Sequence, residues 1–253
     1  MISVAATVNG RTVSILRKDL EAEEGQDPHF FDADYSVAAS TAWLVWEGSW
    51  AVVQLLREQE SWLSQLVVGK HVLELGSGTG LLGLALAAAG GHVVMTDVGS
   101  MVGAVLQPNV EANAESDTAV GALRWASVGC MRSVGAGSAA AQTLDWWQPL
   151  ERQLFPIDVR QCDVIIAAEC AWLQELVDPF VDTMVALLSA PQHPLAVLAF
   201  RERATATSDT FVSAAALLKR LEARGCKIIK RGSYDAPESR GLFTCMYELS
   251  LRD

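Results

Sequence analysis

The order of apolar and polar residues along the chain predicts a hairpin, then helices, then a series of short strands. Residues 2–17 alternate between apolar and polar positions around Asn9-Gly10, a dipeptide typical of a two-residue hairpin turn. Residues 40–66 carry apolar side chains at helical spacing and are expected to form helices that lie over a sheet. The strand-like runs that follow are 71–75, 92–97, 163–169, 194–200, 226–231 and 242–250.

Helical segments separate most of these runs, which favours an α/β fold with a doubly wound, mostly parallel Rossmann-like sheet. The last two runs are joined by a polar loop, GSYDAPESRG, so we expect them to form an antiparallel hairpin. Residues 127–141 are small and low in complexity, and they predict a flexible surface insertion. The chain is therefore divided into an N-terminal extension over 1–39, which holds the hairpin and an acidic linker, and one domain over 40–253.

Composition narrows the class of protein. The formal net charge is −11, and such a surface repels a phosphate backbone, so a nucleic-acid partner is not expected. The 5 cysteines show no CxxC pair, and the 4 histidines have no ligand spacing, so neither a disulfide framework nor a metal site is predicted. No signal peptide or membrane span is expected. We expect a soluble monomer in the cytoplasm or nucleus.

The segment from Val72 to Asp97, VLELGSGTGLLGLALAAAGGHVVMTD, carries the strongest chemical signal. A buried strand ends at Leu75, and glycines then turn the backbone sharply into a helix, where a Cβ would obstruct a ligand. The next strand ends in Asp97, at the edge of the sheet where a carboxylate can accept hydrogen bonds from two ribose hydroxyls.

A dinucleotide site is the alternative, because Gly78, Gly80 and Gly83 also satisfy the GxGxxG pattern. Glu74 argues against it, since its carboxylate lies two residues before Gly76 and would repel a pyrophosphate. The same carboxylate suits a cationic ligand.

Four segments resemble the seven-β-strand protein methyltransferases, in particular the family that methylates lysines of non-histone proteins. They are 42–56, 72–98, 106–113 and 162–188, with a weaker fifth match over 200–218. The resemblance implies a seven-stranded methyltransferase sheet, S-adenosylmethionine as the cofactor and a protein with an accessible lysine as the partner.

The resemblance also assigns cofactor contacts. Those expected at the methionine and ribose portions are Trp46, Glu74, Gly76, Ser77, Gly78, Asp97 and Ala168. The family has a tryptophan after its third strand that stacks on adenine, and Trp125 and Trp146 compete for this role. We prefer Trp146, because Leu144-Asp145-Trp146 is more similar to the family motif.

Glu169-Cys170-Ala171-Trp172 matches the family motif at the mouth where the target lysine enters. Glu169 and Trp172 are thus the candidate catalytic residues, although Trp172 stands where most members have tyrosine or phenylalanine. Purely structural readings stay open: Trp46 as a core residue, Asp97 as a helix cap and Glu169 as an ion-pair partner or cap. Two other functions also stay open, methyl transfer to a small molecule or another protein side chain, and a catalytically silent cofactor-binding module.

Overall fold

The computed structural model describes residues 1–17, 43–115, 125, 130–202, 208–235 and 243–252. The predicted acidic linker lies outside these residues. In the described part of the chain, no helix is long and apolar enough to cross a membrane.

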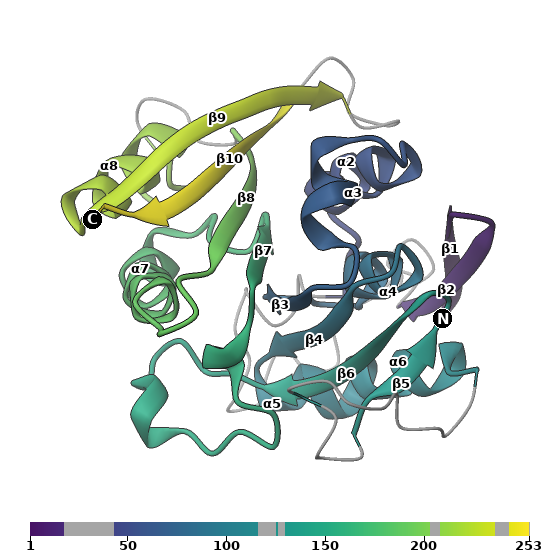
Figure 1. Cartoon of the computed structure of the whole chain (residues 1–253). Helices are drawn as coiled ribbons and strands as arrows, with labels where there is room; N and C mark the ends of the chain where they lie inside the picture. The colour runs from purple at the N-terminus through teal and green to yellow at the C-terminus, as the bar shows by residue number, and fades with distance from the viewer. Residues whose placement is uncertain (18–42, 116–124, 126–129, 203–207, 236–242, 253) are drawn as a thin grey trace, which may run out of the picture.

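A single eight-stranded sheet forms the centre of the molecule, in the order β5-β6-β4-β3-β7-β8-β10-β9 (Figure 1). The pairs β6/β4, β4/β3, β3/β7 and β7/β8 are parallel, whereas β5, β9 and β10 pair antiparallel with their neighbours. The α/β prediction with a C-terminal antiparallel hairpin is therefore confirmed. The strands are β3 His71–Leu75, β4 His92–Asp97, β5 Arg132–Val134, β6 Gly137–Thr143, β7 Val164–Ala168, β8 Leu195–Arg201, β9 Cys226–Asp235 and β10 Phe243–Leu251.

The predicted flexible insertion over 127–141 is wrong where the structure describes it. Residues 132–134 and 137–143 form β5 and β6, and β6 pairs with β4 inside the sheet. The small side chains serve close packing, since a Cβ on Gly137 would lie 2.1 Å from the carbonyl oxygen of Gly91. The low complexity of this segment therefore reflects close packing between strands. The additional strand β5 brings the sheet from the expected seven strands to eight.

Helices cover both faces of the sheet. Successive side chains of a strand point to opposite faces, and in the central strands both sets are apolar and buried. Val93 and Met95 of β4 pack on one side and Val94 on the other, in two separate apolar clusters. The first face carries α2 Glu47–Arg57, α3 Trp62–Val67, α4 Leu81–Ala88 and α6 Gln107–Asn113. The second face carries α7 Gln174–Leu188 and α8 Ala214–Ala223, seen at the left of Figure 1.

The N-terminal hairpin is confirmed. Strands β1 Ile2–Val8 and β2 Arg11–Arg17 pair antiparallel around Asn9 and Gly10, whose φ angles are +50° and +77°. These positive values are those of the turn that matches strand twist. The apolar face of the hairpin is buried in the same cluster as α2 and α4, so the hairpin shares the core of the domain.

Candidate active site

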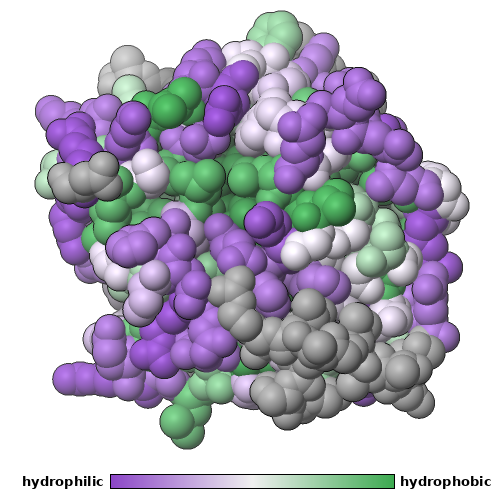
Figure 2. Space-filling view, in the orientation of Figure 1, coloured by the Kyte–Doolittle hydropathy of each residue, from purple (hydrophilic) through white to green (hydrophobic). Residues whose placement is uncertain are grey.

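A cavity of about 310 Å³ opens at the carboxyl ends of β3, β4 and β7. Parallel α/β sheets bind ligands at this edge. Figure 2 shows apolar side chains gathered in a band across the middle of one face, bordered by hydrophilic ones. The lining residues are Leu44, Val45, Trp46, Ser49, Gly76, Ser77, Gly78, Thr79, Leu81, Leu82, Asp97, Val98, Leu144, Asp145, Trp146, Trp147, Ala168, Glu169, Cys170, Trp172, Glu175 and Leu176.

The glycine-rich loop forms one wall of the cavity. It leaves β3 at Gly76, whose φ of +64° is a conformation that L side chains rarely adopt. A Cβ at this position would also lie 2.5 Å from the Cβ of Cys170 and 3.5 Å from the ring of Trp146. Glycine is therefore required at position 76 both by the turn and by the space beside the cavity.

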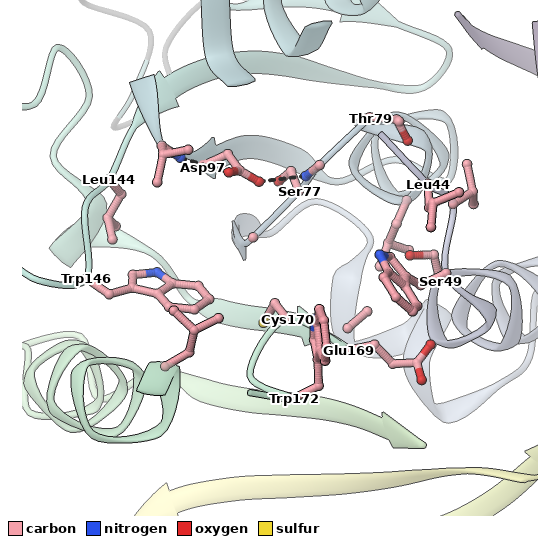
Figure 3. A pocket seen from close by; sticks show the side chains of 18 of the residues that line it. Leu44, Ser49, Ser77, Thr79, Asp97, Leu144, Trp146, Glu169, Cys170 and Trp172 are labelled. Atoms are coloured by element: carbon pink, nitrogen blue, oxygen red, sulfur yellow. Dashed lines mark hydrogen bonds between the residues drawn. The ribbon is translucent and has the colours of Figure 1, made fainter. Parts of the chain in front are cut away.

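Asp97 fixes the far side of this loop. Its carboxylate accepts hydrogen bonds from the backbone N–H groups of Gly78 and Val98, each at 2.8 Å (Figure 3). Burial raises the pKa of Asp97, and the two N–H donors oppose that rise. The backbone N–H groups thus hold the Asp97 carboxylate at the end of β4, where it lines the cavity. An acid at this position in an α/β sheet can accept hydrogen bonds from ribose hydroxyls.

Glu74 lies behind the loop instead of in the cavity. The Ser77 hydroxyl donates to its carboxylate at 2.6 Å, and the side chain is buried. Burial raises the pKa of Glu74 to about 8. Glu74 therefore supports the loop through Ser77, and it is the one predicted cofactor residue that does not line the cavity.

The two candidate adenine-stacking tryptophans lie in different places. Trp146 follows β6, lines the cavity and packs edge-on against Phe180 with ring centroids 5.3 Å apart. Trp125 is buried and packs edge-on against His71, at the start of β3, with centroids 4.9 Å apart. The start of β3 is the end of the strand opposite the glycine loop, so Trp125 is remote from the cavity.

Glu169 directly follows β7 in a left-handed backbone conformation, with a φ of +50°. Its carboxylate accepts a hydrogen bond of 2.6 Å from the N–H of Gly48, in the first turn of α2. A negative charge is stabilised at a helix N-terminus. Beside this contact, Arg201 of β8 forms an ion pair with Glu47 at 2.6 Å. Two contacts thus join the start of α2 to the ends of β7 and β8.

Aromatic rings line the same end of the site. The ring centroid of Trp172 lies 5.5 Å from that of Trp46 and 5.7 Å from that of Phe211. The Trp172–Phe211 pair is stacked, with 29° between the ring planes. In Figure 3, Trp172 and Glu169 lie across the cavity from Asp97 and Ser77. Trp172 is thus held by two aromatic neighbours.

Sequence reasoning missed several residues here. Phe211 lies in the weaker family match over 200–218 but was given no role, and an isolated bridge between residues 173 and 211 brings it beside Trp172. Cys170 and Asp145 lay inside quoted motifs but were given no role, although both line the cavity. Burial raises the pKa of the Cys170 thiol, which argues against a thiolate nucleophile. Among the described residues, no three His, Cys, Asp or Glu side chains are grouped to hold a metal ion.

The sheet order, the glycine loop and the acid at the end of β4 define a methyltransferase fold. The solved CcbJ methyltransferase from Streptomyces caelestis has this fold, with a TM-score of 0.52 at 13% identity over 87% of this chain and 100% of that chain. A family model described as lysine methyltransferase matches residues 26–130 and 127–217. The chain belongs to this lysine methyltransferase family.

Two curated relatives are similar in sequence. The protein-lysine N-methyltransferase EFM6 of Saccharomyces cerevisiae is 26% identical over 153 residues, which are 56% of this chain and 54% of that protein. EEF1A lysine methyltransferase 3 of Xenopus tropicalis is 44% identical over 59 residues, 22% of this chain and 26% of that protein. The chain thus spans about half, or less, of the relatives it matches.

Proposed function

We propose that this protein transfers a methyl group from S-adenosylmethionine to a lysine side chain of another protein. The observation that carries the proposal is the position of two carboxylates across one cavity, Asp97 beside the glycine loop and Glu169 beside aromatic rings. The first carboxylate suits a ribose and the second suits an amine. Membership of the lysine methyltransferase family supports the same reaction.

The residues present fit S-adenosylmethionine. Asp97 would hold the ribose hydroxyls, and the Trp146 indole would supply a flat apolar surface for adenine. The open backbone of Gly76 and Gly78 would allow close approach of the amino-acid portion. Ala168, at the end of β7, lines the cavity with a small side chain and so leaves room for the cofactor.

When bound, S-adenosylmethionine supplies a methyl group on a positively charged sulfur, and S-adenosylhomocysteine remains after the methyl has passed to the amine. The chain's own contribution is alignment and exclusion of water. A lysine amine, with an ordinary pKa of about 10.4, must lose its proton to solvent before it attacks. Apolar walls lower that pKa, because burial disfavours the charged form.

Glu169 would accept a hydrogen bond from the amine and set its direction. A carboxylate has about four acceptor sites, so the group that holds the Gly48 N–H can accept from an amine as well. Trp172 would face the ammonium or methylammonium form, a cation–π contact of about 0.5–2 kcal/mol. The stacking of Trp172 on Phe211 supports this role, because it holds the indole in place.

A basic, lysine-bearing protein segment is the substrate that the charge favours. The net charge of −11 would attract such a segment, within the screening length of about 8 Å at physiological salt. We propose that residues 40–253 form the methyltransferase domain with 1–39 as its extension, and that it acts as a monomer in the cytoplasm or nucleus.

Calorimetric titration of the whole chain with S-adenosylmethionine, with NADH in a parallel experiment, tests the cofactor. We expect micromolar binding of S-adenosylmethionine and no binding of NADH. Binding of NADH alone would show that the glycine loop belongs to a dinucleotide site, and it would overturn the proposal.

A further inference from the structure

Helix α6 completes the open edge of the N-terminal hairpin with two side chains. Asn109 accepts a hydrogen bond from the N–H of Leu16 at 2.9 Å and donates one to its carbonyl at 3.2 Å. Asn113 makes the same pair of bonds with Ser14, at 2.9 and 2.7 Å. Each carboxamide therefore offers β2 the donor and acceptor that a neighbouring strand would offer.

The spacing explains why two asparagines suffice. Residues four apart on a helix lie about 6 Å apart along its axis, and residues two apart on a strand lie about 6.6 Å apart. Asn109 and Asn113 thus match Leu16 and Ser14, respectively, in register. Both asparagines are buried, with 3% and 6% exposure, so the bonds form away from water.

Asn109 makes one additional contact. Its amide nitrogen also donates to the carbonyl of Thr79 at 2.9 Å. Thr79 lies in the glycine loop, next to Gly78, whose N–H donates to Asp97. One buried carboxamide therefore joins the hairpin to the loop that lines the cavity. Asn113 makes no such contact with the loop; its side chain donates instead to the Asn109 carbonyl of the same helix.

We propose that Asn109 is a positioning residue of the cofactor site: it couples α6, the helix that also binds the N-terminal hairpin, to the glycine loop. The inference rests on the proposed function, because it assumes that this loop binds S-adenosylmethionine. The family match begins at residue 26, so the hairpin lies outside the region shared with the family model, whereas Asn109 lies inside it. Asn109 thus connects a segment that precedes the family match to a helix that lies within it.

Mechanically, the Asn109 bond holds the Thr79 carbonyl on the side of α6, away from the cavity. Anchoring this carbonyl restricts the φ and ψ angles of the adjacent loop residues, and so favours the conformation in which the Gly78 N–H donates to Asp97. Loss of the bond would let the loop sample other conformations, and the cofactor would have to select the competent one. The cost would appear as weaker binding, since the binding-competent fraction multiplies the affinity.

Asn109→Ala and Asn113→Ala form a matched pair of variants in the whole chain. Each removes one bidentate contact with β2, and only the first removes the contact with Thr79. Two measurements apply to both: the dissociation constant for S-adenosylmethionine, and hydrogen exchange of the backbone amides over 76–80. Asn109→Asp is the second variant, because it keeps the shape of the side chain and lacks the NH₂ that donates to Thr79 and to Leu16.

We expect Asn109→Ala to weaken S-adenosylmethionine binding about tenfold and to accelerate exchange over 76–80, with Asn113→Ala within about twofold of the wild type in both. Asn109→Asp should follow Asn109→Ala at pH 8. Equal effects of Asn109→Ala and Asn113→Ala, or no effect of either on loop exchange, would overturn the coupling. If the wild type itself fails to bind S-adenosylmethionine, the proposed function fails, and the exchange experiment still decides whether Asn109 holds the glycine loop.

Discussion

The carboxylate of Glu169 accepts a 2.6 Å hydrogen bond from the backbone N–H of Gly48, a residue 121 positions earlier in the sequence. This contact joins the end of β7 to the first turn of α2, which follows Trp46. The helix-cap reading of Glu169 and its catalytic reading are therefore compatible. The α2 N-terminus fixes the direction of the carboxylate, and the same carboxylate lines the cavity.

Gly48→Ala should lower the rate of methyl transfer at least tenfold. A Cβ at position 48 would lie 2.7 Å from the Cγ of Glu169, so the carboxylate must move. Small displacements of a positioning group cost up to about a hundredfold in rate. Gly103→Ala is the control, because a Cβ there meets nothing within 4 Å. Steady-state kinetics of both variants check the prediction, and equal rates would contradict it.

Glu169→Gln should reduce kcat by about a hundredfold or more while the dissociation constant for S-adenosylmethionine changes less than about threefold. The amide keeps an oxygen that can accept from Gly48 but has no negative charge to hold an amine. Single-turnover kinetics and calorimetry on the same preparation separate the two effects. Loss of binding together with turnover would remove Glu169 from its proposed role.

Trp146→Ala should weaken S-adenosylmethionine binding about tenfold, which corresponds to about 1.4 kcal/mol and lies within the usual range for a base stacked on an aromatic ring. Trp125→Phe should leave that affinity unchanged and lower the thermal midpoint, since Trp125 is buried against His71. Calorimetry and thermal unfolding of both variants test the choice between the two tryptophans. The reverse pattern would assign adenine stacking to Trp125.

Glu74→Gln should change how stability depends on pH. The folded-state pKa of Glu74 is raised to about 8, above its value of about 4.5 in the unfolded chain. Its stabilising contribution is thus fully present below pH 4.5 and is lost as the pH rises through 8. From pH 5 to 8 the wild type should lose unfolding free energy relative to Glu74→Gln, by at most about 1.4 kcal/mol per pH unit. Urea unfolding at four pH values measures this difference, and parallel curves would show that Glu74 does not titrate as described.

Local signals in the sequence predicted the parts of the fold that depend on local physics. The Asn9-Gly10 turn needs two positive φ angles, and that dipeptide supplies them. The loop at Gly76 and the strand ending at Asp97 were found because a glycine turn and an acid at a strand end have fixed spacing. The lysine methyltransferase family was recognised from the same segments.

Contacts between distant segments could not be predicted in this way. A flexible insertion was predicted over residues 127–141, because small side chains fit either a mobile loop or a strand that needs close neighbours such as Gly91. Glu74 was expected to meet the cofactor, but the Ser77 hydroxyl holds it behind the loop. Neither Phe211 nor the Asn109 contact with Thr79 has a local pattern, since each depends on tertiary packing.

Transfer of radiolabelled methyl from S-adenosylmethionine to a protein extract, followed by hydrolysis and separation of the amino acids, tests the proposed reaction most directly. We predict label in protein with the wild type, recovered as ε-N-methylated lysine, and loss of that label with Glu169→Gln. Label confined to small molecules, label on a different amino acid, or no label with a wild type that binds S-adenosylmethionine would contradict protein-lysine methylation.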